Sequence, residues 1–432
     1  MLLEFEDVIN DIDTVHLPYG TALTVAAGAG STDAAKLLLD HGANPDITGG
    51  IYYDPLTAAA SSFSFDISLS ARSAQIMDTI LRETVYVQIR SETGLSLFHI
   101  ACTAGSLEMV EVIIKKLREQ AGPLNITDRE DSTPLHFAAI NTSSSVLAYL
   151  LGLGCDSLDP NAMNARGFTP LHTAFTTGTL ESINLLLGAG ANINVIGPDK
   201  ITMLHLAAQN FQNPEVLDLL SEMDVNSRDE WDRTPLHITC GYGAPEAVEW
   251  LLDHGADPTV LDDTGRSALH FACQNQIPGS ERILEVLLKK GLSPRDRDCG
   301  GSTPLHLAFH DPKEAHNDLF WTQYVKGHWD SFSETECMNK VVHLLVALDG
   351  YEDLKDLRDG MGNTILHLAC WRGIADLVLL LLSMDARTDL RENRGFLPHE
   401  LMESSELRQY VEGRIEALNG RKALGDASKR SA

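Results

Sequence analysis

A short motif centred on Leu-His recurs along the chain at intervals close to 33 residues. STPLHFAA (132–139) returns as FTPLHTAF (168–175), TMLHLAA (202–208), RTPLHITC (233–240), RSALHFAC (266–273), STPLHLAF (302–309) and NTILHLAC (363–370). A fixed period of about 20 to 50 residues indicates a repeat architecture, in which each unit buries its apolar face against its neighbours. The repeat therefore accounts for the length of 432 residues without a series of unrelated domains.

Weaker copies extend the array towards the amino terminus. They read GTALTVAA (20–27), YDPLTAAA (53–60) and SLFHIAC (96–102). The position of the motif histidine is then occupied by Thr24, Thr57, His99, His136, His172, His205, His237, His270, His306, His367 and Glu400. These positions mark about eleven repeats, and one interval, the 61 residues from His306 to His367, is far too long.

Each copy carries the signals of a helix pair. Thr begins the first helix as its N-cap, and Pro follows in the first turn, where its missing N–H costs nothing. Leu and small Ala positions allow neighbouring helices to approach closely. A second helix ends at Gly, and an Asp/Asn/Gly turn follows. The pattern predicts an all-α fold of stacked helix–turn–helix units.

These features resemble the ankyrin repeat, whose signature is T-P-L-H-x-A at a period of 33 residues. LLLDHGANPDI (37–47), LLLGAGANINV (185–195) and WLLDHGADPTV (250–260) are similar to its second helix and the turn that follows. The resemblance implies a solenoid of about eleven helix–turn–helix repeats with short β-turn fingers, covering residues 16–419. The YGTAL-like opening makes the array similar to those of large fungal regulatory and receptor-type proteins.

The two ends are expected to differ from the array. Residues 1–15 read as a partial repeat or an irregular N-terminal cap, with a missing upstream segment as the alternative. Residues 404–419 read as an amphipathic helix that caps the array. The last segment, 420–432, has four basic residues against Asp426 and is expected to be a flexible tail.

Most residues that could serve as catalytic groups or metal ligands occupy motif positions of the repeat. The motif histidines are expected to tether neighbouring turns by hydrogen bonds. Cys102, Cys240, Cys273 and Cys370 occupy the second Ala position, so we expect small buried thiols without disulfides. No zinc spacing, dinucleotide loop, P-loop or hydrolase motif is present. We therefore expect no cofactor, no metal and no enzyme activity.

Charge and hydropathy restrict the partners. The formal net charge is −28, which disfavours direct nucleic-acid binding because phosphate contacts need clustered Lys and Arg. The longest apolar run, Leu377–Leu382, is too short to span a bilayer. We expect a cytoplasmic or nuclear protein that binds other proteins.

The resemblance places the partner-binding surface on a concave face, built from turn tips and the exposed side of each first helix. Trp, Tyr and Arg are the residue types that dominate binding hot spots. The corresponding positions are Glu230, Trp231, Arg233 and Tyr242 in the seventh repeat, Asp263, Arg266 and Gln274 in the eighth, and Met361, Asn363, Trp371 and Arg372 in the tenth. Local packing is the alternative interpretation for the aromatic residues.

The long interval marks an insertion in the ninth repeat. PLHLAFH (304–310) reads as the first helix and CMNKVVHLLVAL (337–348) as the second, so about 311–336 lie between them. This insertion carries Phe320, Trp321, Tyr324, His328 and Trp329. We weigh a helix that folds back on the array, a docking surface for a partner, and a metal or catalytic site, in decreasing order of preference.

Three functions follow from these observations. The first is a non-enzymatic scaffold or regulatory adaptor. The second is a transcriptional co-regulator that acts through a DNA-binding partner, for instance on a fungal specialised-metabolite gene cluster. The third is an enzyme centred on the insertion. Nuclear enrichment that depends on Lys429 and Arg430 would favour the second.

Overall fold

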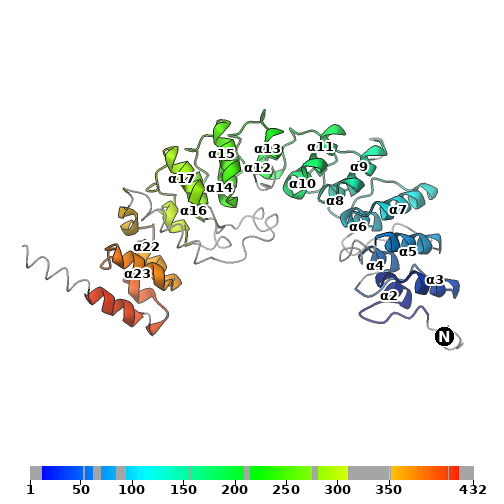
Figure 1. The fold of residues 1–432 in the computed structure, drawn as a ribbon, viewed down its shortest axis with the longest axis horizontal. Helices are drawn as coiled ribbons and strands as arrows, with labels where there is room; N and C mark the ends of the chain where they lie inside the picture. The colour runs from blue at the N-terminus through cyan, green and yellow to red at the C-terminus, as the bar shows by residue number, and fades with distance from the viewer. Residues whose placement is uncertain are drawn as a thin grey trace, which may run out of the picture. The chain divides into compact units, whose positions relative to one another are not determined.

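The fold is described from a computed structural model of the chain, which divides into two compact units, Met1–Leu206 and Ala207–Ala432. It describes residues 12–51, 54–61, 70–83, 94–141, 143–154, 158–208, 215–274, 281–309, 350, 352–406 and 408–417. Within these ranges the regular elements are helices, together with one isolated β-bridge between His16 and Gly20 (Figure 1). The predicted all-α fold is confirmed.

The described residues of the first unit form five helix pairs in chain order. They are α2 (Ala22–Gly28) with α3 (Thr32–Asp40), α4 (Pro55–Ser61) with α5 (Ser70–Glu83), α6 (Leu97–Ala104) with α7 (Leu107–Glu119), α8 (Pro134–Ala139) with α9 (Ser145–Gly152), and α10 (Pro170–Thr177) with α11 (Leu180–Gly188). Each first helix packs on the next first helix, from α2 against α4 to α8 against α10. The 3-10 helix η3 (Pro198–Lys200) follows.

Helix α12 (Met203–Ala207) contains the boundary between the units. The second unit continues with α13 (Glu215–Asp218), α14 (Pro235–Tyr242), α15 (Pro245–Asp253), α16 (Ala268–Gln274), α17 (Glu281–Lys289), α18 (Pro304–Leu307), η5 (Glu352–Asp356), α22 (Ile365–Arg372), α23 (Ala375–Ser383) and η6 (Pro398–Leu401). Residues 408–417 are also helical. Here α14 packs on α16, α16 on α18 and α18 on α22.

Where the motif histidine is present, it fixes the start of the first helix. In α10, the N–H of Thr169 donates to Nδ1 of His172 at 3.1 Å, and the Thr169 hydroxyl accepts the N–H of His172 at 3.4 Å. The other ring nitrogen reaches the following repeat in several copies, as in the 2.9 Å bond from Nε2 of His136 to the carbonyl of Phe168. The expected tethering role is confirmed for the histidines whose Nε2 makes such a bond, among them His99, His136 and His237. In η6 Glu400 replaces the imidazole, and its Oε2 accepts the N–H of Leu397 at 2.7 Å.

The turns between repeats project as fingers whose tips are joined by backbone hydrogen bonds. In the second unit, the N–H of Asp263 donates to the carbonyl of Trp231 at 3.0 Å, and the N–H of Asn393 donates to the carbonyl of Met361 at 2.9 Å. The tip residue Gly265 has a φ of 78°, a left-handed conformation that Gly adopts without strain. Adjacent fingers are therefore held in register.

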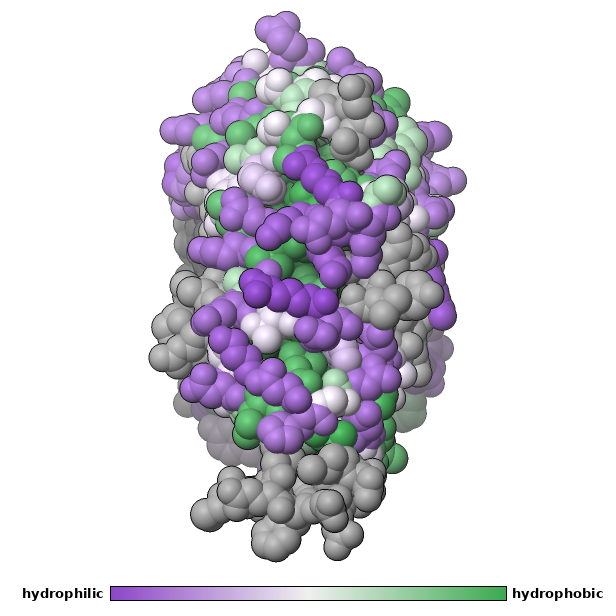
Figure 2. All heavy atoms as spheres, turned by 90° about the vertical axis from the view of Figure 1, so that its right-hand side faces the viewer, coloured by the Kyte–Doolittle hydropathy of each residue, from purple (hydrophilic) through white to green (hydrophobic). Residues whose placement is uncertain are grey.

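Small and aliphatic motif residues form the core between repeats. The motif leucines, among them Leu135, Leu171 and Leu236, are buried. Cys102, Cys240, Cys273 and Cys370 are buried free thiols, as predicted. Figure 2 shows one face of the molecule, where polar side chains (purple) cover much of the coloured surface and apolar ones (green) lie between them.

Some sequence predictions lie outside the described residues. These include the N-terminal residues 1–11, the tail at 420–432, and the insertion at about 311–336 with Phe320, Trp321, Tyr324, His328 and Trp329. The boundaries of cap, array and tail stay predictions. No helix found in the described ranges combines the length and apolar composition that crossing a membrane requires.

Candidate functional site

We use the name finger face for the finger tips and first helices of the second unit, which correspond to the predicted concave face. In its seventh repeat, Glu230 is exposed and Trp231 is half-buried at the tip. Arg233 differs from our expectation of a surface contact, because it is only 2% exposed. Its Nε donates to Oδ2 of Asp229 at 2.7 Å, and its guanidinium lies 4.5 Å from the centroid of the Trp231 ring.

Arg233 is therefore a buried residue that stabilises the finger. A buried arginine needs a paired charge, which Asp229 supplies, and the Trp231 ring covers the guanidinium. Tyr242, at the end of α14, is half-buried, and burial of its hydroxyl raises the pKa of that group. Gln274 is buried at the end of α16 rather than exposed. Of the seventh-repeat candidates, Glu230 is exposed, Trp231 and Tyr242 are half-buried, and Arg233 is buried.

In the eighth repeat one candidate side chain is exposed and another is partly buried between repeats. Asp263 is exposed at the finger tip. Arg266 is partly buried, and its Nε lies 3.4 Å from Oδ2 of Asp298 in the next finger. Arg266 therefore links two repeats, and a partner would meet Asp263 first.

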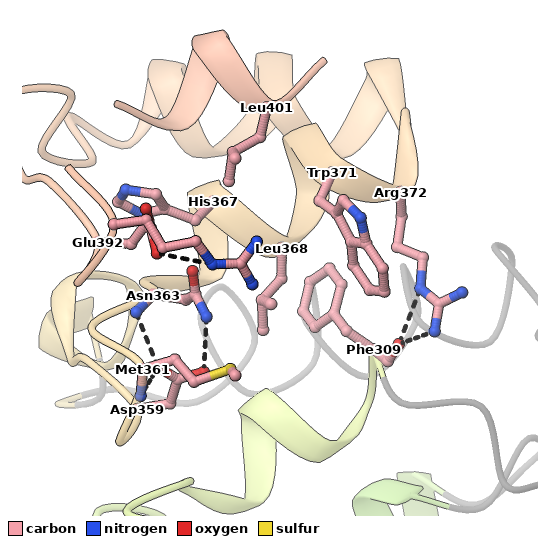
Figure 3. Close-up of a pocket in the computed structure, with 11 residues that line it drawn as sticks. Phe309, Asp359, Met361, Asn363, His367, Leu368, Trp371, Arg372, Glu392 and Leu401 are labelled. Carbon is pink, nitrogen blue, oxygen red and sulfur yellow. Dashed lines mark hydrogen bonds and ion pairs between the residues drawn. The ribbon is translucent and has the colours of Figure 1, made fainter. Parts of the chain in front are cut away.

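The tenth repeat presents the most exposed aromatic side chain of the finger-face candidates. Trp371, near the end of α22, is 50% exposed. The guanidinium of Arg372 lies 4.6 Å from the Trp371 ring centroid. Nε and Nη2 of Arg372 also donate to the carbonyl of Phe309, at 3.0 and 2.8 Å (Figure 3). This forked contact fixes the end of α22 against the end of the ninth repeat's first helix.

Trp371 borders a pocket of about 290 Å³ in the second unit (Figure 3). Side chains from three consecutive repeats line it: Phe309, Asp359, Met361, Asn363, His367, Leu368, Trp371, Arg372, Glu392, Arg394 and Leu401. Figure 3 shows the Phe309 and Trp371 rings close together, with Leu368 beside Phe309 and Met361 further away on the other side of Leu368. The pocket thus has apolar walls and a charged rim.

The acidic groups of the pocket are occupied by hydrogen bonds from the chain itself. Oδ1 of Asp359 accepts the N–H groups of Met361 and Asn363 at 2.9 and 2.7 Å. Oε1 of Glu392 accepts the N–H of Phe396 at 3.2 Å. These carboxylates shape the fingers, since each satisfies backbone donors that the tight turn leaves without a backbone partner.

The basic group at the mouth is different. Arg394 has a side chain that is 73% exposed, and its Nε lies 3.9 Å from Oε2 of Glu392. This distance exceeds that of a normal hydrogen bond. Arg394 therefore presents most of its donors to solvent beside the apolar walls.

The histidine and the cysteine beside the pocket are both neutral. Burial lowers the pKa of His367, so this ring is neutral, and its Nε2 donates to the carbonyl of Phe396 at 3.3 Å. Burial also raises the pKa of the nearby Cys370 thiol, which keeps it from acting as a thiolate nucleophile. Among the described residues, no three His, Cys, Asp or Glu side chains are placed to hold a metal ion together.

Sequence reasoning named Met361, Asn363, Trp371 and Arg372 but did not bring them together as a pocket. It missed Phe309 and Leu401, because they belong to the repeats on either side of the tenth and reach the pocket only through packing between repeats. It also missed Arg394. That residue holds the same finger position as Trp231 and Met361, six residues before the motif position, so the register could have found it.

Comparison with known protein families supports the repeat. A model described as ankyrin repeats (3 copies) matches residues 67–163, 98–197 and 204–298. A model of the single ankyrin repeat matches residues 20–50 and 361–393. Together these matches include both units and the tenth-repeat part of the pocket.

Individual relatives share the repeat over part of their length. Human transient receptor potential cation channel subfamily A member 1 is 29% identical over 318 residues, which are 71% of this chain and 27% of the channel. The mouse B-cell lymphoma 3 protein homolog is 31% identical over 189 residues, 42% of this chain and 41% of that protein. The chain thus spans less than half the length of either relative.

The human ASB11 ankyrin repeat domain is 24% identical and aligns with 50% of this chain and 92% of its own, with a TM-score of 0.42.

Proposed function

The chain belongs to the ankyrin-repeat family, and from this premise we propose that it is a non-enzymatic scaffold or adaptor that binds a protein partner on the finger face. Ankyrin repeats are typically protein-interaction modules and are usually non-catalytic. What carries the proposal is the exposure of Met361 (59%) and Trp371 (50%) on one pocket of that face. Large side chains of this kind supply most of the energy at interfaces when a partner buries them.

The rest of the finger face supports the same function. Glu230, Asp263 and the half-buried Trp231 lie on finger tips that backbone hydrogen bonds hold in register. A surface that is ordered before binding loses little conformational freedom on association, which favours affinity. Arg233 and Arg266 contribute by holding these fingers.

The proposed function is tested by affinity purification with variant chains as controls. Wild type, Trp371→Ala and Trp250→Ala are each immobilised, and recovered proteins are quantified. Trp250 lies on the second helix α15, where its Nε1 donates to Oδ1 of Asp218 at 2.9 Å, so it serves as a tryptophan control away from the finger tips. A specific partner is recovered by wild type and Trp250→Ala and depleted with Trp371→Ala. Equal recovery by all three chains would contradict the proposal.

A second candidate is a transcriptional co-regulator of the fungal type, acting through a DNA-binding partner. The basic residues Lys429 and Arg430 near the end of the chain favour it, while the net charge of −28 argues against direct contact with DNA. Nuclear enrichment that is lost in a Lys429→Ala, Arg430→Ala double variant would support it. Strictly cytosolic residence of the wild type would count against it.

A further inference from the structure

We propose that the pocket between α18, α22 and η6 binds a linear segment of the partner in which a large apolar residue is followed or preceded by one acidic residue. The apolar side chain enters between Phe309, Leu368 and Trp371, and the carboxylate pairs with Arg394 at the mouth. This inference rests on the proposed function and specifies the chemistry of the segment that the finger face recognises.

The pocket has room for one large apolar side chain. Its volume of about 290 Å³ is just below the range of roughly 300 to 1,000 Å³ that is common for ligand pockets. Its walls are two aromatic rings, one thioether and two leucines, from Phe309, Trp371, Met361, Leu368 and Leu401. Met and aromatic side chains adapt well to a single bulky apolar group.

The walls are fixed before anything binds. The forked bond from Arg372 to the carbonyl of Phe309 joins two walls. The bond from the N–H of Asn393 to the carbonyl of Met361 joins the two fingers that carry Met361 and Arg394. Binding therefore requires little ordering of the pocket, which suits a short segment with few contacts.

The charged side chains at the mouth of the pocket determine which residue of the segment lies next to the apolar one. Asp359 and Glu392 accept hydrogen bonds from backbone N–H groups of their own fingers. Their carboxylates are therefore less available to a basic residue of the partner segment. Arg394 is 73% exposed and has a planar fork of donors that matches a carboxylate. A single acidic residue next to the apolar anchor satisfies it.

The net charge of the chain limits how acidic the segment can be. At −28, the long-range field repels a segment with many acidic residues. A carboxylate in direct contact with Arg394 gains from short-range pairing, whereas additional acids outside the pocket meet only repulsion. We therefore expect one acidic residue beside the anchor and neutral or basic residues around it.

The test uses a phage-displayed library of random heptapeptides, panned against the full chain. Enriched peptides are synthesised, and their affinities are measured by fluorescence anisotropy for wild type, Trp371→Ala, Arg394→Glu and the control Trp250→Ala. Thermal unfolding of each variant verifies folding. Arg394→Glu keeps the test valid if Trp371→Ala does not fold, because the Arg394 side chain is exposed.

The expected result is a shared motif of a large apolar residue with Asp or Glu beside it. Trp371→Ala and Arg394→Glu each weaken binding at least about tenfold, and Trp250→Ala leaves it unchanged. Peptides selected on Arg394→Glu carry Lys or Arg in place of the acid.

Other outcomes overturn the inference. Enriched peptides with basic residues beside the anchor, or affinities insensitive to both pocket variants, refute the proposed chemistry. Self-association that is abolished by Trp371→Ala identifies a second copy as the occupant, and peptide binding only after deletion of 313–333 identifies the chain itself. Absence of enriched peptides, together with Trp371-dependent recovery of a partner, refutes the linear segment and leaves the proposed function standing.

Discussion

The imidazole of His237 joins two repeats, because its Nε2 donates to the carbonyl oxygen of Val260 at 3.1 Å while its Nδ1 accepts the N–H of Thr234 at 3.1 Å. Neutral imidazole has one donor and one acceptor, and both are used. Protonation would turn Nδ1 into a donor that faces the Thr234 N–H. The neutral ring is therefore part of the interface between repeats.

This relationship predicts that stability falls on mild acidification. Burial is the main cause that lowers the pKa of His237 to about 3 and those of His172 and His270 to about 4. In the unfolded chain these rings take up protons near their ordinary pKa of about 6.5. As the pH drops below about 6.5, the unfolded chain therefore binds more protons than the folded chain. The free energy of unfolding that depends on these neutral rings is fully present above this pH and is lost as the pH falls below it.

The measurement is the urea midpoint at about pH 7.5 and about pH 5.5, a window that avoids most carboxylate titration. We expect a lower midpoint at the acidic value. Equal midpoints at the two pH values would show that these histidines do not stay neutral in the fold.

A core substitution should expose the nearest-neighbour character of the array. Leu236 in α14 is buried, and α14 packs on α16 and α15. Leu236→Ala leaves a cavity and is expected to cost about 2 to 5 kcal/mol of unfolding free energy. It should also separate the unfolding of the two halves, because each repeat is stabilised only by its neighbours.

The matched control is Leu261→Ala, since Leu261 is 47% exposed on the finger that follows α15. It should change the unfolding free energy little. Chemical denaturation followed by circular dichroism distinguishes the variants. A single cooperative transition for Leu236→Ala, with the same midpoint as wild type, would contradict the nearest-neighbour account.

Thiol counting tests the register of the repeats. Under denaturing, non-reducing conditions we expect seven free thiols, all the cysteines of the chain. Cys240 and Cys273 hold equivalent positions in α14 and α16, and packed helices lie about 8 to 10 Å apart, beyond the reach of a disulfide. A disulfide between these two residues would mean that the register is wrong.

Much of the fold could be predicted from the sequence because each repeat carries its own local signals. Thr234, Pro235 and His237 place the cap, the first turn and the tether of α14 within four residues. Such signals act at short range and recur in every copy. Even Glu400, which is not a histidine, occupies the tether position in the structure.

The site was less predictable because it depends on contacts between repeats. The position of Arg233 is typical of a surface residue, yet pairing with Asp229 and covering by Trp231 bury it. The Phe309 wall of the pocket lies more than one period from Trp371 in the sequence, so periodicity alone could not pair them. Side-chain packing across repeats decides these placements.

The insertion offers a separate prediction. If partners bind on the finger face, deletion of 313–333 with a short Gly/Ser link should leave partner affinity nearly intact. Its cost in stability should be modest, since the entropy of loop closure changes slowly with loop length. Loss of binding on deletion, with Trp231→Ala and Trp371→Ala harmless, would place the functional element in the insertion that contains Trp321 and Trp329.

The most direct test of the central claim is the affinity of the recovered partner for the wild-type chain and for Trp371→Ala, measured by isothermal titration calorimetry. If the finger face binds the partner, removal of this exposed ring should weaken binding about 30-fold, or about 2 kcal/mol, while Trp250→Ala binds like wild type. Equal affinity of wild type and Trp371→Ala would contradict the assignment of the binding surface to the finger face.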